Sequence, residues 1–550
     1  MAIKRYNAIA DNTITNAFKM DLETRGSGSN MGGSDVVEVF SLYGQASGTL
    51  GASQELARTL IKFPISTIQT DRSASTVPAS GSVSWFLRMF NARHAETLPK
   101  DFVMSVSALE REWDEGEGLD MEEYKDRGYP LGSGSNWIYA REDKTWQEPG
   151  GDFDPVNASA SYTQRFERGD EDLEIDITPL AEMWLNDAGN ALGSKPNYGV
   201  IVHLSGTYEA YFSGTVKEPP AQLNTGSESE VVHNPNGSKR SYYTKKFFGR
   251  GSEYFFKRPI LEARWDSRNK DDRGNFYYSS SLAPADDNLN TLYLYNYVRG
   301  RLRNIPELDK TGNVIYVSLY SGSHTQGGNI STSSVGLLNM AKGGDVVAAL
   351  DFNATGGMAS TGIYTCSVCI TSSTPLATKL FDVWHAGPSA GGYGATQFHT
   401  GVIYPKTIDT PAINPSTEYV VSVTDLRTVY YTDETARFRL YTRPRNWSPN
   451  IYSVASSTPE NTTIESASYQ IYRVSDEHTV IAYGTASTSI PGRGELHTLL
   501  SHDLSGNYFD LDMNMFEPGY AYGLRFAYYN GAIGSWVEQR DRFKFRVEKT

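Results

Sequence analysis

The stretch "EDLEIDITPLAEMWLNDAGN", residues 171–190, joins a strand pattern to a helix pattern and sets the reading of the whole chain. In its first seven positions Leu173, Ile175 and Ile177 alternate with acidic residues. That period of two is typical of a half-buried strand. The same alternation recurs in "SVSWFLRMF", residues 82–90, which predicts a second strand of this kind.

The rest of the quoted stretch, residues 175–190, is the one short segment that reads clearly as a helix. Thr178 is the expected N-cap and Pro179 the expected first helical residue. Leu180, Met183 and Trp184 then share one face, so that face must be buried. Trp184 could stack on a sugar ring, but an inward Trp on a short amphipathic helix is usually core, and we expect this helix to close one end of a β-sandwich.

Composition extends the strand pattern to the whole protein. The 550 residues include 35 Tyr and 50 Gly, and long runs of helix-forming residues are scarce. This favours an all-β protein. Because one hydrophobic core rarely serves so long a chain, we expect about three domains in series.

Charge and hydropathy exclude several classes of protein. The net charge is −14 and no Lys/Arg stripe could neutralise phosphates, which disfavours nucleic acid as a partner. There is no run of about 18 apolar residues and no apolar stretch after the basic N-terminus, so we expect neither a membrane segment nor a signal peptide. We therefore attribute the six N-glycosylation sequons of the chain to chance.

The two cysteines, Cys366 and Cys369, are too few for a disulfide framework. Their C-x-x-C spacing lacks two further zinc ligands. The nine scattered histidines form no known metal or catalytic motif. We therefore expect no cofactor.

Several motifs of the first half occur in a recognisable order. They are "RTLIKFPI" (58–65), "WDEGEGLD" (113–120), "NWIYA" (136–140), "TWQEPGGDFD" (145–154), "DITPLAEMWL" (176–185), "NYGVIVHLSG" (197–206) and "KRPILEARWD" (257–266). This order resembles the DNRLRE class of β-sandwich modules, found on bacterial surface proteins and in structural proteins of tailed phages. The resemblance implies a jelly-roll-type sandwich over residues 1–275, with 257–266 as its last strand and the polar segment 215–243 as a loop within it.

The last block, residues 416–550, carries "MFEPGYAYGLRFAYY". Phe516, Pro518 and Tyr522 have the spacing of the tyrosine corner of immunoglobulin and fibronectin-type sandwiches. A complete Ig-like domain is predicted there, with Tyr522 structural. Short strand patterns between Gly/Ser/Thr turns predict a second, small Ig-like sandwich over residues 276–415.

The acidic run from Glu110 to Asp126 is the main candidate for chemistry. Two of its carboxylates could act as a glycosidase pair, or several could hold calcium. Consecutive loop acids usually stay ionised in water, so a solvated loop is the preferred interpretation and calcium the alternative. Asp510 and Asp512 are read as outward acids of a strand that need no ligand.

Two functions remain open. Serial sandwiches without a catalytic motif suit a structural virion protein of a tailed phage, in the neck, tail, baseplate or capsid surface, assembling as a homo-oligomer with other virion proteins. The alternative is a carbohydrate-binding or carbohydrate-cleaving surface protein. For that alternative, or for a protein interface, Trp113, Trp137 and Trp146 near the acidic run are the expected contacts.

Overall fold

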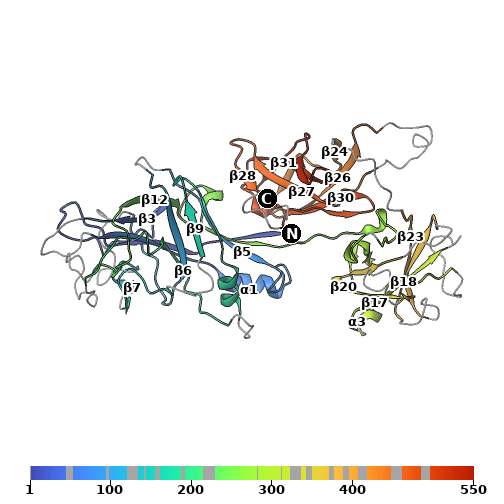
Figure 1. Ribbon diagram of the computed structural model, residues 1–550, viewed down its shortest axis with the longest axis horizontal. Coiled ribbons are helices and arrows are strands. Elements are labelled where there is room, and N and C mark those ends of the chain that lie inside the picture. The colour runs from blue at the N-terminus through green and yellow to red at the C-terminus, as the bar shows by residue number, and fades with distance from the viewer. Residues whose placement is uncertain are drawn as a thin grey trace. The chain divides into compact units, whose positions relative to one another are not determined.

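The computed structural model confirms an all-β protein, in which strands far outnumber helices (Figure 1). The residues that the structure describes are 2–44, 54–93, 98–119, 134–141, 144–154, 162–186, 193–214, 230–281, 283–310, 312–321, 336–341, 350–370, 377–387, 395–406, 418–447, 461–484 and 496–550. They form two compact units, Met1–Asp266 with Glu495–His497, and Ser267–Gly494 with Thr498–Thr550.

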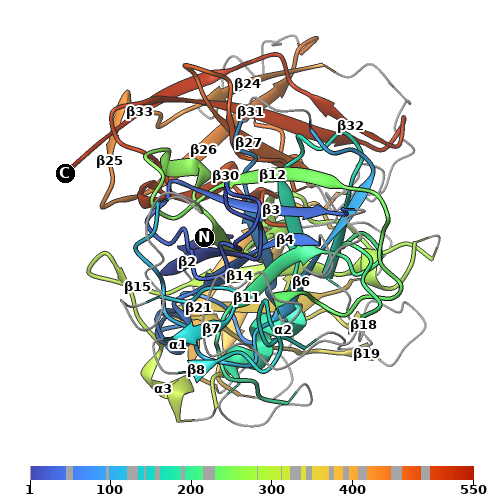
Figure 2. The same ribbon diagram turned by 90° about the vertical axis from the view of Figure 1, so that its left-hand side faces the viewer.

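The first unit is a β-sandwich. Its strands are β1 (Ile3–Asn7), β2 (Ala10–Thr15), β3 (Val36–Leu42), β4 (Glu55–Lys62), β5 (Ser84–Met89), β6 (Phe102–Ala108), β7 (Tyr139–Arg141), β8 (Lys144–Thr145), β9 (Tyr162–Phe166), β10 (Leu173–Asp176), β11 (Val200–Leu204), β12 (Tyr242–Phe248) and β13 (Ile260–Arg264). One sheet has the order β1-β13-β5-β10 and the other β12-β3-β4-β11-β6-β9, with β2 paired to β4 (Figure 2).

The predicted alternation sets the inner faces of this sandwich. Trp85, Leu87 and Met89 of β5 are fully buried, as is Leu173 of the paired strand β10. Their side chains meet those of the facing sheet in one hydrophobic core. The strand β13, within the predicted segment 257–266, pairs with both β1 and β5 and is the last strand of the first unit along the chain.

Two helices lie against one another and against the first sandwich, α1 (Ile65–Ser73) and α2 (Thr178–Leu185) (Figure 1). The predicted helix is present, but its N-cap is Ile177, so the assignment of Thr178 as N-cap is wrong by one residue. Thr178 instead accepts the backbone N–H of Trp85 at 2.7 Å through its hydroxyl, fixing the helix start to β5. Helix α1 was not predicted.

The second unit contains two further groups of sheets. Its strands are β14 (Asn290–Tyr295), β15 (Tyr297–Val298), β16 (Arg301–Leu302), β17 (Val314–Ser321), β18 (Met340–Ala341), β19 (Leu350–Asp351), β20 (Ala354–Ser360), β21 (Ile363–Val368), β22 (Leu380–His385), β23 (Gln397–Ile403), β24 (Tyr419–Val423), β25 (Val429–Tyr431), β26 (Thr435–Pro444), β27 (Ala467–Arg473), β28 (Thr479–Ile481), β29 (Ser501–Asp503), β30 (Gly506–Asp512), β31 (Ala521–Asn530), β32 (Ser535–Glu538) and β33 (Phe543–Glu548). A one-turn helix, α3, spans Pro306–Asp309.

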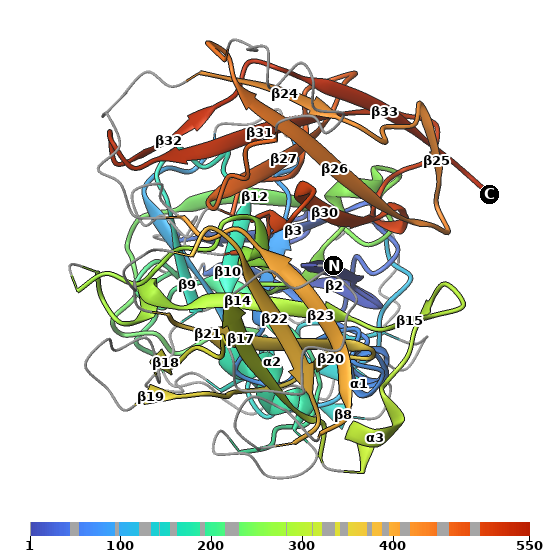
Figure 3. The same cartoon turned by 90° about the vertical axis from the view of Figure 1, so that its right-hand side faces the viewer.

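The first group is a six-stranded antiparallel sheet, β14-β21-β20-β17-β22-β23, with the hairpins β15–β16 and β18–β19 beside it in sequence (Figure 3). The second is a sandwich of β24-β26-β30-β29 on β25-β33-β31-β27-β28, with β32 at the edge of β31. Stacked aromatic rings link its two layers: the rings of Tyr469 and Phe509 are 4.2 Å apart.

Candidate functional site

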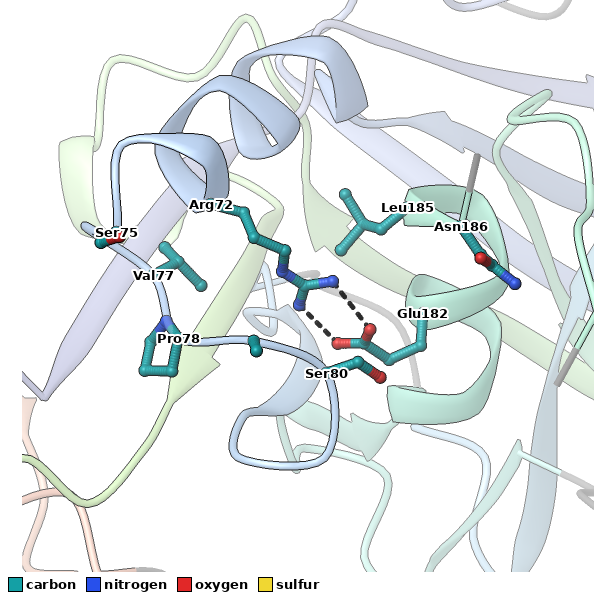
Figure 4. Close-up of a pocket in the computed structure, with 9 residues that line it drawn as sticks. Arg72, Ser75, Val77, Pro78, Ser80, Glu182, Leu185 and Asn186 are labelled. Atoms are coloured by element: carbon teal, nitrogen blue, oxygen red, sulfur yellow. Dashed lines mark hydrogen bonds and ion pairs between the residues drawn. The ribbon is translucent and has the colours of Figure 1, made fainter. Parts of the chain in front are cut away.

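A cavity lies between α1 and α2 (Figure 4). Arg72 in the last turn of α1 reaches Glu182 of α2 and donates two hydrogen bonds, of 2.8 and 2.6 Å, to its two carboxylate oxygens. The cavity has a volume of about 380 Å³ and an apolar wall. Its lining residues are Arg72, Ser75, Val77, Pro78, Ala79, Ser80, Glu182, Leu185 and Asn186.

The carboxylate of Glu182 also accepts a hydrogen bond from outside the two helices. The indole N–H of Trp85 donates to the same carboxylate at 2.8 Å. Burial by itself would raise the pKa of Glu182, but the hydrogen bonds from Arg72 and Trp85 outweigh it and hold that pKa below its usual range. A carboxylate that stays ionised and is held by two fixed donors is a poor general acid. The pair therefore joins two helices, and the cavity beside it offers no uncommitted charge.

The three tryptophans expected at a ligand or partner surface are all buried. Trp113, Trp137 and Trp146 are between 0% and 4% exposed, and each donates its indole N–H to a backbone carbonyl at 2.7–2.8 Å. They pack with residues such as Leu60 and Ile201 in a second core, on the other side of the seven-stranded sheet from the first. This corrects the expectation that their rings form a glycan or interface contact.

The acidic run is only partly described: within residues 110–119 the acids Glu110, Glu112, Asp114 and Glu117 are exposed, and Glu115 is half-buried. Glu115 accepts hydrogen bonds from Arg250 at 2.7 and 3.0 Å and from the backbone N–H of Asp11 at 2.8 Å. Gly116 and Gly118 pack against Asn30 so closely that no Cβ would fit. The solvated-loop interpretation therefore fits four of the five described acids, which are exposed, and Glu115, paired with Arg250, is the exception. Residues 120–126 lie outside the described residues.

Asp11 is the unusual acid of this region. It is 1% exposed, and its carboxylate accepts the backbone N–H of Arg250. Burial, reinforced by the nearby charge of Glu115, raises the pKa of Asp11 to about 6, while its contacts with Arg250 oppose the rise. Among the described residues no three His, Cys, Asp or Glu side chains come together as a metal site.

Both residues expected to be structural are in structural positions. Trp184 is 4% exposed and belongs to the core of the first sandwich. Tyr522 is fully buried, and its hydroxyl donates to the backbone oxygen of Glu517 at 2.7 Å. That hydrogen bond to a carbonyl five residues upstream is the tyrosine corner. Asp510, read as an outward acid, pairs with Arg437 at 2.8 Å.

The structure also brings together Ser and His pairs that the sequence did not indicate. Ser107 Oγ lies 3.5 Å from His203 Nε2, and Glu209 is 3.8 Å from His203 Nδ1. However, His203 Nδ1 is 2.7 Å from the oxygen of Leu204, and Glu209 accepts two hydrogen bonds from Arg58. Burial lowers the pKa of His203. Because Glu209 is bound by Arg58 and does not orient the imidazole, the geometry is not that of a catalytic triad.

A second pair of a serine and a histidine is buried away from solvent. Ser318 Oγ lies 2.9 Å from His385 Nε2, and both residues are fully buried. A nucleophile without access to a substrate has no catalytic use. Cys366 and Cys369 are likewise buried, both as free thiols, and burial raises the pKa of each.

Comparisons with known proteins give no family. No family model and no curated protein matches the chain. Distant solved structures are the fibronectin(III)-like modules of Clostridium thermocellum CbhA (9% identity, 52% of this chain and 92% of that one, TM-score 0.13) and the titin Ig tandem domains (11%, 38% and 80%, 0.12). The tandem Ig repeats of Dlar are similar at 11% identity, 44% and 91% coverage and a TM-score of 0.12. Such scores are too low to carry a functional argument. No described helix is long and apolar enough to cross a bilayer.

Proposed function

We propose that this chain is a structural protein of a tailed-phage virion, a neck, tail, baseplate or capsid-attached component that acts through protein–protein contacts. The proposal starts from the ordered motifs of residues 58–266, which resemble the DNRLRE modules of such virions. A series of β-sandwiches with an Ig-like module at the C-terminus suits the same role, because stacked sheets give a rigid scaffold whose edges and loops can contact neighbours.

The observation that carries the proposal is the use of buried charge. Buried carboxylates with described arginine partners join parts of the chain that are distant in sequence: Glu182 with Arg72, Glu209 with Arg58, Glu230 with Arg25, Glu262 with Arg5, Asp382 with Arg273, and Asp152 with Arg111. Glu262 also pairs with Arg264 of its own strand. A catalytic carboxylate needs an altered pKa and an open path to substrate. These carboxylates instead join strands, helices and loops, which is what a scaffold requires of them.

One exposed surface of the C-terminal sandwich, β24 to β33, suits contacts with other chains. On the hairpin of β31 and β32, Tyr529, Ile533 and Val537 are 45%, 48% and 38% exposed. The ring of Trp536 lies edge-on to that of Tyr529, with centroids 5.7 Å apart. The strand β32 pairs with β31 alone among the described strands, so one backbone edge is open. Edge strands and exposed aromatic residues are common in protein interfaces.

The test has two parts. Quantitative mass spectrometry of purified virions from the phage that encodes the chain should find it at a fixed copy number per particle, after washing at high salt. The purified chain, or the chain with its neighbours, should form homo-oligomers in mass photometry. A protein that is abundant in the lysate but absent from washed particles would overturn the proposal.

The carbohydrate alternative makes different demands. It requires a groove with open aromatic rings, whereas Trp113, Trp137 and Trp146 are buried here. A glycan array read with the whole chain distinguishes the two functions: specific, competable binding of one glycan would favour the alternative, and a blank array together with a fixed copy number in virions would favour the structural role.

A further inference from the structure

Lys245 is a buried lysine in the first sandwich. It lies on β12, at the edge of the seven-stranded sheet, and is 1% exposed. Lysine is almost never fully buried unless its amine has partners. The aromatic rings of Phe166 and Phe247 enclose it, with their centroids 5.3 and 4.8 Å from Nζ. The sequence around it, "YYTKKFF", gives no sign that the first Lys points inward and the second outward.

The amine of Lys245 contacts a side-chain amide. Its Nζ lies 2.5 Å from Oδ1 of Asn91, and it also donates to the backbone oxygens of Gly169 and Glu171 at 2.8 and 2.9 Å. The carbon bonded to Oδ1 is the electrophilic centre of the amide, so a nucleophile and an electrophile are held together inside the protein. Such fixed proximity replaces a bimolecular encounter and strongly accelerates reaction.

Asn91 is held from its backbone as well. It follows β5 of the four-stranded sheet and forms a β-bridge with Phe247. Its own N–H donates to the carboxylate of Asp172 at 2.7 Å. Asp172 thus touches Asn91 directly, and of the nearby carboxylates it acts most strongly on the charge of Lys245.

We propose that Lys245 and Asn91 join in an intramolecular isopeptide bond. The Nζ lone pair attacks Cγ of Asn91, a new Nζ–Cγ amide bond forms, and the Cγ–Nδ2 bond breaks. The leaving nitrogen departs as ammonia. Starting from the ammonium form of Lys245, one proton moves to the carboxylate of Asp172 before attack, and the attacking nitrogen gives up a second, which the departing NH2 takes up to become ammonia. The ammonia then takes the proton from Asp172, which returns to its ionised form, and leaves as ammonium. The overall change is one amide exchanged for another with release of ammonium, so no oxidant or co-reactant is needed.

The surroundings favour the nucleophilic form of the amine. Burial lowers the pKa of Lys245 to about 8, although Asp172, Glu171 and Asp170 act in the opposite direction. A minority of the amine is therefore unprotonated at neutral pH, far more than for a lysine in water. The bond would connect the edge strand β12 of one sheet to the end of β5 in the other, and so fasten the two layers covalently. This inference does not depend on the proposed virion role.

The test is the intact mass of the purified full chain. The proposal predicts a mass lower than that of the sequence by one molecule of ammonia, and a tryptic species in which the peptide of Lys245 is linked to that of Asn91. A chain with the full sequence mass would overturn it, and would leave Lys245 as an ammonium held by three carbonyls.

Loss of ammonia can also arise by succinimide formation at Asn-Gly pairs, of which the chain has two, Asn236–Gly237 and Asn530–Gly531. Lys245→Met and Asn91→Ala remove one reactant each and leave both pairs intact. Each variant should regain the full mass. If the mass deficit persists in Lys245→Met, the isopeptide assignment fails.

Asp172→Asn tests the proton transfer separately. The variant keeps an oxygen that accepts the N–H of Asn91 but removes the proton acceptor. We expect the intact mass of this variant to equal the mass of its sequence, without loss of ammonia. Its circular dichroism spectrum should be like that of the wild type. Complete cross-linking in this variant would overturn the role given to Asp172.

Discussion

Glu262 on β13 accepts a hydrogen bond from Nε of Arg5 on β1 at 2.7 Å, where the two strands pair. The same carboxylate contacts Arg88 of β5 at 3.3 Å and Arg264 at 2.6 Å. Burial would raise the pKa of Glu262, but the three arginines outweigh it and hold that pKa well below its usual range. One acid thus ties three adjacent strands of the four-stranded sheet.

Glu262→Gln should therefore destabilise the first sandwich severely. The variant removes the charge shared by three arginines, and breaking a buried ion pair costs about 3–5 kcal/mol. Urea unfolding followed by the fluorescence of Trp85 and the other tryptophans measures the loss. Arg165→Gln is the matched control, because its pair with Asp101 is exposed and screened by water, so its loss should have little effect on stability. Equal effects of the two variants would contradict the shared-charge account.

Glu182 gives the first unit an acid-sensitive contact. Its folded-state pKa is below the ordinary value of about 4.3, so the stability from the Arg72 pair is complete above that pH and is lost as the pH falls through the lower, folded value. Glu182→Gln should lower stability by about 1.5–3 kcal/mol at neutral pH and have little effect at the most acidic pH where the fold survives. Thermal unfolding at a series of pH values measures this, and a difference that does not change with pH would contradict it.

For Asp11 we expect stability to depend on pH in the opposite direction from Glu182. Burial raises its folded-state pKa to about 6, so the folded state holds its proton more tightly than the unfolded state does. Stability should decrease as the pH rises from about 4 to about 6, where the unfolded carboxylate is already ionised. Asp11→Asn should remove this decrease and stabilise the protein by about 1–3 kcal/mol above pH 6. The control is Asp114→Asn, at an exposed residue of the neighbouring acidic stretch, which should change neither the stability nor its dependence on pH. A destabilised Asp11→Asn would contradict the prediction.

The tyrosine corner offers a test in the second unit. Tyr522→Phe removes the hydroxyl that donates to Glu517 and leaves the ring in place. The loss should be about 1–2 kcal/mol in chemical unfolding, because a buried acceptor loses its donor. Tyr520→Phe, at a residue two positions earlier in the chain and 38% exposed, should have no measurable effect. Equal stabilities of Tyr522→Phe and the wild type would show that the corner does not brace the strand.

Strand periodicity is sufficient to predict much of the first sandwich and of the C-terminal sandwich, β24 to β33. The alternation of 82–90 and 171–177 depends only on which residues face the core, and β5 and β10 follow it. Helix α1 was missed because "ISTIQTDRS" has no apolar stripe; Ile65 and Ile68 are its only buried residues. Its position depends on packing against α2, which no local pattern indicates.

The wrong prediction of exposed tryptophans has a different cause. Trp113, Trp137 and Trp146 lie among Gly, Asp and Glu, a composition typical of surface loops. The loops fold back over the seven-stranded sheet, which is buried on both faces as a result. The available signal was the strand "VIVHL" of β11, in which four of the five residues are apolar and all five are buried, because a mostly apolar strand without alternation indicates a strand covered on both sides. The partners of Lys245 are 74 to 154 residues away in sequence, so contact with Asn91 could only come from the fold.

We propose that this protein is a virion scaffold in which buried charges and aromatic rings hold the sheets together. A reconstruction of the intact phage particle by electron cryomicroscopy tests it most directly. The account predicts density for the first sandwich, with α1 and α2 beside it, repeated in symmetric copies at the neck, tail, baseplate or capsid surface. A particle traced completely at side-chain resolution with no density for these sheets would contradict it.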